Sequence, residues 1–452
     1  MDIAYGGRLY LVRLPNEILR TVCVMTVRSR PRGSRSDMSI CSSRVASVLF
    51  VAIVLLAGCG SRDDTGQGSL PAGFVDELVA KVEIPTDVAF APGGRLLVTS
   101  QTGTLWVIDN GRGAPRTALD LKNRVCSERE RGLVGVTVDP RFSANHFVYV
   151  YFTFKKFNGC PIRTAHVPVN RVVRYRARPD GTLDPGSAHI LIDNVPSYNA
   201  IHNAGDLAFG QDGYLYVSIG DGGRDYARRT TTSFGNEAAR DRNVLLGKIV
   251  RITRDGQPAP GSPFVGSGTV RCATTGPVSP GLRCREIYAW GLRNPYRFAF
   301  DPNSAATRFF INDVGEVTWE EVNDGRRGAD YGWNLREGPC PNAGLVRCAP
   351  APPQMSDPVV SYAHRGGCIA ITGGAFVPAG VWPHQYDDDY LFADFGCSKI
   401  FVIDGNGGEI EGFATEVPLI TSMAFGPARS SIALYYTTFA GGGELRRISY
   451  KP

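Results

Sequence analysis

The chain of 452 residues is 43% hydrophobic and 20% charged, a composition typical of a folded globular protein rather than a disordered one. Its 53 glycines and 30 prolines favour many tight turns over long helices, so we expect an all-β fold. The formal net charge of +6 is a poor indicator of a nucleic-acid partner, and we expect none, because part of it comes from arginines ahead of the folded region: Arg28, Arg30, Arg32 and Arg35.

The first 59 residues have the pattern of an export signal. A basic stretch ends at Arg44, an apolar run extends from Val45 to Ala57, and the sequence Leu-Ala-Gly-Cys ending at Cys59 resembles a lipobox. The alternatives are a plain signal peptide or a short transmembrane anchor, but the apolar run is shorter than the roughly 20 residues that cross a bilayer. We therefore predict a lipid on Cys59 that holds an exported protein at a membrane surface, either periplasmic or cell-surface.

Residues 60–72 are polar and rich in Gly and Ser, which is typical of a flexible tether, and we expect one domain over residues 73–452. One pattern recurs six times in it: an apolar strand ending in Phe or Val, a turn with Pro, Asp or Gly, and a second apolar strand. The residues that end the first strand of each unit are Phe90, Val138, Phe209, Phe300, Phe376 and Phe425.

Several units continue into a third apolar stretch, as at 104–109, 171–177 and 248–253. Three or four antiparallel strands per unit are typical of a propeller blade, and six such units arranged radially bury a continuous core that no single unit could bury. The pattern therefore predicts a six-bladed β-propeller. A β-helix is the alternative, but it requires a short, regular period that this sequence does not have.

The connecting segments differ in length, and long insertions at one end of a propeller usually form its binding surface. The longest are 221–246, 258–285 and 313–360, and we expect the functional site among them. A short helix is expected within 234–246.

His202 stands at the start of the inner strand of the third unit. We expect it to point toward an axial pocket, where an imidazole with a pKa near neutrality can accept a proton. The alternative is a structural histidine that caps a strand or bonds to a neighbouring loop.

Arg293 and Asn294 open the fourth unit in the equivalent position. The guanidinium would bring a fixed positive charge and a fork of donors, suited to a quinone carbonyl or a carboxylate, and Asn294 could add an amide donor. The alternative is a structural ion pair of Arg293 with Asp206 or Asp313.

The segment 313–333 gathers carboxylates, glycines and aromatic residues, and oxygen ligands at a glycine-rich bend suit calcium. A solvated loop face is the alternative. The shorter sequence Asp-Gly-Gly-Arg-Asp at 221–225 is better explained by a tight turn than by a calcium loop.

Eight cysteines follow Cys59, and an even number in an exported chain favours disulfides. Because none has the CxxC spacing of a zinc or redox site, metal-thiolate chemistry is the weaker interpretation. Among the 105 possible connectivities we expect near neighbours to pair. These pairs are Cys126–Cys160, Cys272–Cys284, Cys340–Cys348 and Cys368–Cys397.

Four segments together resemble the glucose/sorbosone dehydrogenase family: GLVGVTVDP (132–140), HNAGDLAFGQDGYLYVSIGDGG (202–223), GLRNPYRFAFDP (291–302) and the DVGE, WEEVN and DYGW sequences of 313–333. The resemblance implies a six-bladed propeller that binds pyrroloquinoline quinone over calcium at its mouth and oxidises a sugar or related alcohol. By position, His202 matches the base and Arg293 and Asn294 match cofactor contacts. The backbone carbonyls of Gly315 and Glu316 match the calcium position.

The chain departs from the sugar-oxidising members at several of their functional positions. Ile201 replaces an acid before the histidine, Glu130 replaces a cofactor-binding glutamine, and the basic anchors of the quinone carboxylates fall on Gly396, Leu419 and Thr421. In these features the chain resembles the branch that includes the propeller of Hedgehog-interacting protein, a binding module.

Three hypotheses follow from the sequence. The first is a calcium- and quinone-dependent dehydrogenase acting on an aldose or related alcohol, and the second is a non-catalytic lipoprotein propeller that binds a glycan or protein. The third, metal-assisted hydrolysis of a lactone or ester, requires several carboxylates around one metal. The oligomeric state stays open.

Overall fold

The computed structural model describes residues 69–341, 348–429 and 431–452. The export signal, the predicted lipid site Cys59 and most of the predicted tether lie outside the described residues. Within the described ranges no helix is both long enough and apolar enough to span a membrane.

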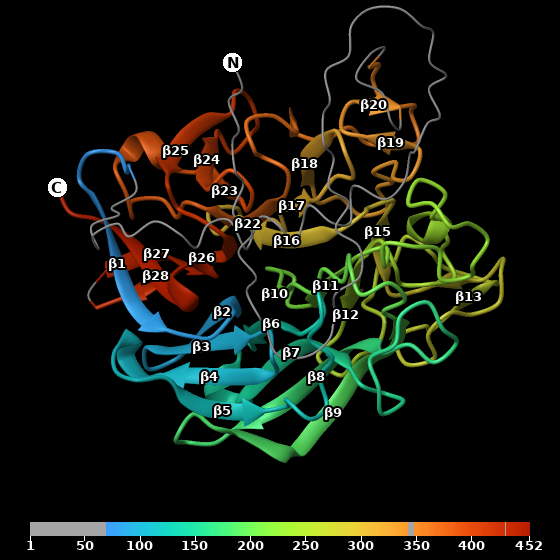
Figure 1. Ribbon diagram of the computed structural model, residues 1–452, viewed down its shortest axis with the longest axis horizontal. Helices are drawn as coiled ribbons and strands as arrows, with labels where there is room; N and C mark the ends of the chain where they lie inside the picture. The colour runs from blue at the N-terminus through green and yellow to red at the C-terminus, as the bar shows by residue number, and fades with distance from the viewer. Residues whose placement is uncertain (1–68, 342–347, 430) are drawn as a thin grey trace, which may run out of the picture. The chain divides into compact units, whose positions relative to one another are not determined.

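Six antiparallel sheets of four strands each form the described domain, and they are arranged as the blades of a propeller (Figure 1). This confirms the predicted six-bladed architecture. The strands of the first three blades, from the inside outward, are β2 (Pro85–Ala91), β3 (Arg95–Ser100), β4 (Thr104–Ile108) and β5 (Arg116–Asp120); β6 (Leu133–Val138), β7 (Phe147–Phe154), β8 (Val169–Ala177) and β9 (Leu183–Pro196); β10 (Leu207–Phe209), β11 (Leu215–Ile219), β12 (Lys248–Ile252) and β15 (Ile287–Trp290).

The other three blades follow the same order. Their strands are β16 (Pro295–Phe300), β17 (Phe309–Asp313), β18 (Trp319–Asp324) and β21 (Val360–Ala363); β22 (Ile371–Phe376), β23 (Tyr390–Asp394), β24 (Lys399–Ile403) and β25 (Glu411–Thr415); β26 (Ile420–Ala428), β27 (Ser431–Thr438), β28 (Glu444–Tyr450) and β1 (Phe74–Lys81).

The sixth blade takes its outer strand from the beginning of the domain. Strand β1 pairs antiparallel with β28, from Phe74 opposite Tyr450 to Lys81 opposite Glu444. Figure 1 shows this blue strand beside the red strands of the C-terminus. The two ends of the domain therefore close the ring within one sheet, so that the last blade is completed by residues at the start of the domain.

The hydrophobic core is divided into clusters that lie between adjacent blades. One cluster joins Tyr149 of the second blade to Leu215 of the third, and another joins Tyr216 of the third to Phe298 of the fourth. All six recurring anchor residues lie on the inner strands, as predicted. Each strand alternates its side chains between the two faces of its blade, so the inner part of every blade contributes to two clusters.

Short elements lie in the loops that connect strands of the same blade. They are the helix α2 (Phe142–Asn145), the 3₁₀ turns η1 (Asp109–Gly111), η2 (Glu237–Ala239), η3 (His384–Tyr386) and η4 (Ala440–Gly442), and two small ladders, β13 (Thr269–Val270) with β14 (Arg283–Cys284) and β19 (Arg336–Glu337) with β20 (Cys340–Pro341).

The helix expected within 234–246 is only the single turn η2, which corrects that prediction. The turn begins at Asn236, whose side chain accepts a hydrogen bond from the Ala238 N–H. The buried ammonium of Lys248 then donates to the carbonyls of Ala238 and Ala239, at 3.0 and 2.9 Å. These carbonyls therefore accept hydrogen bonds from a side chain and not from the N–H groups of a following helical turn.

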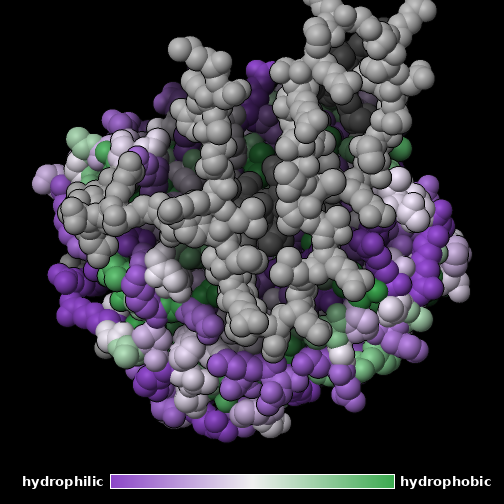
Figure 2. All heavy atoms as spheres, viewed as in Figure 1, coloured by the Kyte–Doolittle hydropathy of each residue, from purple (hydrophilic) through white to green (hydrophobic). Residues whose placement is uncertain are grey.

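Four disulfides join the eight cysteines of the domain in the predicted pairs, which confirms the expected connectivity. They are Cys126–Cys160, Cys272–Cys284, Cys340–Cys348 and Cys368–Cys397. Figure 2 shows a largely hydrophilic outer rim on the face it presents, with only scattered hydrophobic residues.

Candidate functional site

The candidate residues lie at the ends where the inner strands begin. His202 precedes β10, Glu130 precedes β6, and Arg293 and Asn294 precede β16. The His202 N–H donates to Glu130 Oε2 at 2.6 Å, and Asn294 Oδ1 accepts from the Ala204 N–H at 3.1 Å. Residues from the second, third and fourth blades therefore meet in one place.

The imidazole of His202 is held by Asp221, a residue that the sequence analysis did not assign to the site. His202 Nδ1 lies 2.7 Å from Asp221 Oδ1, and both side chains are buried. The other carboxylate oxygen accepts a hydrogen bond from Trp333 Nε1 at 2.8 Å. Burial alone would raise the pKa of Asp221, but His202 and Arg293 more than offset burial and lower it below its usual value.

An ionised Asp221 can only accept hydrogen bonds, so Nδ1 carries a hydrogen, and in the neutral imidazole the lone pair is then on Nε2. The turn expected at 221–225 is also present, because the Gly223 N–H donates to Asp221 Oδ1 at 2.7 Å. Asp221 follows β11, whose end lies beside the start of β10 in an antiparallel pair. Because the end of one strand lies beside the start of its antiparallel partner, the sequence alone could have indicated that Asp221 lies near His202.

The backbone at His202 requires a glycine opposite it. His202 has a φ of 52°, and a Cβ on Gly220 would lie 2.1 Å from the His202 carbonyl oxygen. Only glycine at position 220, directly after β11, allows the backbone to approach the histidine this closely.

Arg293 forms an ion pair, but not with either predicted acid. Its Nε lies 2.9 Å from Glu316 Oε2, and Nη1 donates to the Val314 carbonyl at 2.8 Å. Burial would lower the pKa of Arg293, yet the charges of Glu316 and Asp221 raise it, so the guanidinium stays charged.

Asp313 binds the backbone and not the guanidinium, so the predicted Arg293–Asp313 pair is wrong. Its carboxylate accepts from the N–H groups of Arg293, at 2.9 Å, and Asn294, at 2.6 Å. The other predicted partner, Asp206, lies on the propeller axis, where its charge interacts with that of Arg297. Glu316 was missed because it comes from the loop after β17 and reaches Arg293 only in the folded chain.

The loop of Gly315 and Glu316 is wrapped around a buried carboxylate. Glu337 Oε1 accepts N–H hydrogen bonds from residues 316, 317, 318 and 319 at 3.0, 3.0, 2.8 and 3.1 Å. A Cβ on Gly315 would lie 1.7 Å from the Trp319 carbonyl oxygen, so the loop can close only with glycine there. No described residue donates a hydrogen bond to the carbonyl oxygens of Gly315 or Glu316, which are therefore available for a cation such as calcium.

The three positions that should anchor quinone carboxylates carry no cation. In addition, the space beside Gly396 is already occupied, and the hydroxyl of Thr421 is already engaged in a hydrogen bond. A Cβ on Gly396 would lie 2.4 Å from the Gly367 carbonyl oxygen. The Thr421 hydroxyl donates to the Pro85 carbonyl at 2.8 Å, and Leu419 is apolar.

Of the long loops expected to form the site, two contribute and one does not. The 221–246 loop supplies Asp221, and the 313–360 loop supplies Glu316 and Trp333. The 258–285 loop leaves from the opposite end of its blade and makes none of the described contacts to the site residues.

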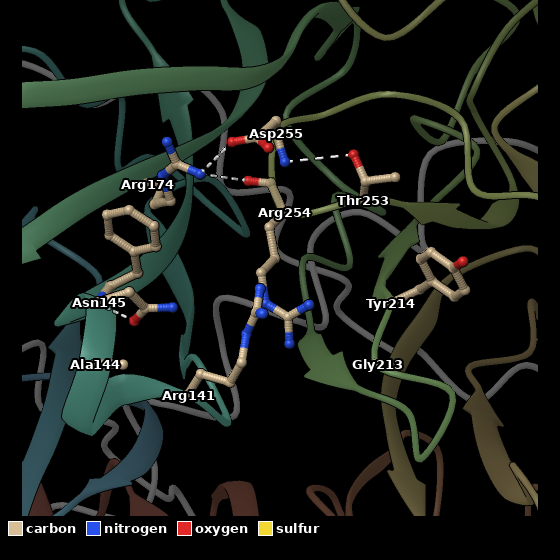
Figure 3. A pocket seen from close by; sticks show the side chains of 10 residues that line it. Arg141, Ala144, Asn145, Arg174, Gly213, Tyr214, Thr253, Arg254 and Asp255 are labelled. Carbon is tan, nitrogen blue, oxygen red and sulfur yellow. Dashed lines mark hydrogen bonds and ion pairs between the residues drawn. The ribbon is translucent and has the colours of Figure 1, made fainter.

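Two cavities lie away from these residues. One of about 400 Å³ is axial and is lined by Asp87, Asp206 and Arg297 together with apolar side chains of the inner strands. The other, of about 470 Å³, lies between the second and third blades at the far ends of the inner strands, and Figure 3 shows Arg141, Arg174 and other residues that line it. Neither cavity includes a candidate site residue.

Clusters of potential metal ligands give no support to the hydrolase hypothesis. In the described parts of the chain, two groups of three such side chains come close enough to share an ion: Cys126, Glu128 and Cys160, and Cys368, Asp394 and Cys397. Both contain a disulfide.

Comparison with known proteins places this geometry in context. The HIPL2 protein of Arabidopsis thaliana is 28% identical over 385 residues, which cover 74% of this chain and 54% of that protein. The chain thus spans about half the length of this relative. Quinoprotein glucose dehydrogenase B of Acinetobacter calcoaceticus is 24% identical, with 72% of this chain and 68% of that protein covered.

Solved structures agree with the fold. The pyrroloquinoline-quinone-bound aldose sugar dehydrogenase of Streptomyces coelicolor is 25% identical with a TM-score of 0.62, covering 84% of this chain and 99% of that one. The apo aldose sugar dehydrogenase of Escherichia coli, at 21% identity and a TM-score of 0.65 over 83% and 99% of the two chains, shows the same fold.

The sequence model of the family described as Glucose / Sorbosone dehydrogenase matches residues 82–413, which include the inner strands of the first five blades, β2, β6, β10, β16 and β22. That range contains His202, Asp221, Arg293 and the loop of Gly315. The chain therefore belongs to the glucose/sorbosone dehydrogenase family.

Proposed function

We propose that the protein is an exported dehydrogenase that oxidises an aldose sugar or related alcohol with pyrroloquinoline quinone and calcium. The observation that carries this proposal is the buried His202–Asp221 pair beside Arg293. Four disulfides are consistent with an oxidising compartment, and a lipid on Cys59 would hold the protein at a membrane surface.

His202 would act as the general base. Asp221 holds the ring in the tautomer that leaves Nε2 free, so Nε2 can take the proton of a sugar hydroxyl. The ionised Asp221 then stabilises the imidazolium that forms, because its charge lies 2.7 Å from Nδ1. Loss of the hydroxyl proton makes the carbon a better hydride donor.

The residues present fit the reactive end of the quinone. Arg293 and Asn294 would contact it, Glu130 lies beside the Asn294 amide at 3.5 Å, and the carbonyls of Gly315 and Glu316 would hold calcium. When bound, the quinone supplies the hydride acceptor and calcium draws electron density from it.

The carboxylate end of the quinone has no cationic partner at Gly396, Leu419 or Thr421. Each lost charge-assisted contact costs on the order of 1.5–3 kcal/mol, so we expect quinone binding to be weaker than in relatives that carry these cations.

The test is reduction of a dye by the purified protein, supplied with quinone and calcium, across a panel of sugars. We expect turnover that falls about 10²–10⁴-fold in His202→Ala. His189→Ala is the matched control, because that histidine is exposed and lies outside the site. Absence of both turnover and quinone binding at micromolar concentration would overturn the proposal.

The second candidate is a non-catalytic propeller that binds a glycan or protein. It is favoured by one observation: the guanidinium that should meet a quinone is already engaged by Glu316 and the Val314 carbonyl. This function predicts that His202→Ala leaves ligand affinity unchanged, whereas the dehydrogenase predicts loss of turnover.

A further inference from the structure

Four arginines border the loop that leads into His202, and we call them the arginine cluster: Arg129, Arg163, Arg224 and Arg228. Arg163 is the most firmly attached. Its N–H donates to the Tyr198 carbonyl at 2.8 Å, and its Nε donates to Asn199 Oδ1 at 2.7 Å. Its guanidinium is thus anchored three residues before the proposed base.

Arg129 and Arg224 approach the same loop through their neighbours in the chain. The N–H of Glu130 donates to the Ala200 carbonyl at 3.2 Å. Gly223 packs so closely on Ile201 that a Cβ there would lie 2.3 Å from Cγ1 of the isoleucine. The arginines of the cluster therefore belong to separate loops of the second and third blades that contact residues 198–201.

Arg228 completes the cluster beside Tyr198. Its guanidinium carbon lies 5.9 Å from the centre of the Tyr198 ring.

Within the described residues the arginine cluster has no carboxylate partner, although Arg224 Nη1 donates a hydrogen bond to the Thr231 carbonyl. None of the four forms an ion pair with any residue in the described ranges. The neighbouring Arg229, by contrast, contacts Asp225, Glu237 and Asp241 at 2.9, 3.0 and 2.7 Å. Desolvation together with the charges of Arg224 and Arg129 lowers the pKa of Arg163.

The loops that present Arg129 and Arg163 are also tied together. The fully buried Arg131 donates to Ser197 Oγ at 2.9 Å and to the carbonyls of Cys160 and Pro161, both at 3.0 Å. The disulfide Cys126–Cys160 links the same two loops. Because these loops are already cross-linked in the free protein, an anion that binds between them would require little rearrangement of the loops.

We propose that the arginine cluster is an anion-binding subsite beside His202, and that the protein takes a carbohydrate carrying a carboxylate or phosphate group. This inference deepens the proposed function and rests on it for the reaction. Guanidinium groups bind carboxylate and phosphate through paired hydrogen bonds, and clustered like charges are relieved by such a ligand. The subsite lies on the second and third blades, whereas the positions of the quinone anchors lie on the fifth and sixth blades or their connections.

The test compares glucuronate with glucose, because the two share a ring and differ in the carboxylate. Calorimetric titration of the purified protein should show glucuronate binding at least about tenfold more tightly than glucose, the effect of one charge-assisted contact. Glucose 6-phosphate should share this preference. The double variant Arg163→Gln and Arg224→Gln should lose it, and the control Arg141→Gln, an exposed arginine at the opposite end of the inner strands, should keep it.

Equal binding of glucuronate and glucose would overturn the inference, as would a preference that survives in the double variant. A double variant that weakens quinone binding but keeps the glucuronate preference would assign the cluster to the cofactor and also overturn it. A preference for glucuronate without dye reduction would support the subsite while the dehydrogenase proposal failed.

Discussion

His202 and Asp221 show how much one side-chain contact decides. The ring of a lone histidine can donate or accept at either nitrogen, and only a fixed partner selects one tautomer. Here the partner is a buried carboxylate whose own pKa is held low by His202 and Arg293 against the effect of burial. The pair therefore acts as one unit, with Asp221 orienting the residue that would take the proton.

Replacement of Asp221 by Asn tests that orientation. The Asn amide can donate a hydrogen bond to His202 Nδ1 and so stabilise the imidazole tautomer with its hydrogen on Nε2. In that tautomer Nε2 has no lone pair and cannot take a proton. We expect Asp221→Asn to lower kcat by about 10²–10⁴-fold with a smaller change in KM, as measured by steady-state dye reduction. Asp225→Asn is the control, because Asp225 lies in the same turn and pairs with Arg229. An unchanged kcat would show that Asp221 has no orienting role.

At the scale of elements, loops are held by buried groups rather than by long secondary structure. Glu337 closes the 316–319 loop with one oxygen, and Arg131 joins the loops at 160–161 and 197. Such groups are buried, and each satisfies several backbone groups at once, so removal of one leaves several polar atoms without a partner.

Glu337→Gln should lower the free energy of unfolding by about 1.5–3 kcal/mol, because an amide oxygen accepts the four N–H groups without the charge of the carboxylate. Urea unfolding followed by tryptophan fluorescence measures the change. The exposed Glu409→Gln should be neutral. An equal stability of the two variants would contradict the role of Glu337.

The four disulfides close loops with separations of 34, 12, 8 and 29 residues. In the chain-entropy description each should stabilise the fold by about 2.5–4 kcal/mol, an upper figure because native strain subtracts from it. Reduction should therefore lower the melting temperature in calorimetry. Thiol titration of the unfolded, unreduced protein that begins after Cys59 should find no free thiol, and two or more per chain would refute the pairing.

At the scale of the whole molecule, the ring depends on the strand that joins its two ends. The ring of Phe74 in β1 packs edge-on against those of Trp382 and Phe413, with ring centres 4.8 and 5.2 Å apart, and it also contacts Tyr450. It ties the first strand of the domain to the fifth and sixth blades.

Phe74→Ala should destabilise the fold by about 3–5 kcal/mol, because it leaves a cavity where three aromatic rings meet. Thermal unfolding by circular dichroism measures the loss. The control is Phe157→Ala, since that ring is 47% exposed. A loss no larger than that of the control would show that closure of the ring does not rest on Phe74.

The axis of the propeller carries a second whole-molecule feature. Asp87 and Asp206, from the first and third blades, are buried near the single guanidinium of Arg297. Burial raises the pKa of Asp206 to about 7, and the neighbouring Asp87 contributes to the rise.

This arrangement predicts how stability depends on pH. The unfolded Asp206 loses its proton near the usual value of 3.8, whereas the folded one keeps it up to about pH 7. The native state thus binds more protons in this pH window than the unfolded state does. The contribution of Asp206 to the free energy of unfolding therefore falls as pH rises from about 4 to 7. Asp206→Asn should flatten that fall in urea titrations, and the exposed Asp120→Asn should not. An unchanged slope would contradict the prediction.

The sequence by itself determined the repeat, the number of blades, the pairing of the cysteines and the positions of His202 and Arg293. These depend on local patterns: strand periodicity, turn residues, short cysteine separations and the place of a residue at the start of an inner strand. The tertiary structure alone decided that Asp221 holds His202, that Glu316 rather than Asp313 pairs with Arg293, and that the loops of Arg129, Arg163 and Arg224 meet at residues 198–201. Those contacts join segments far apart in the chain, and their meeting depends on how the blades close into a ring, which no local pattern encodes.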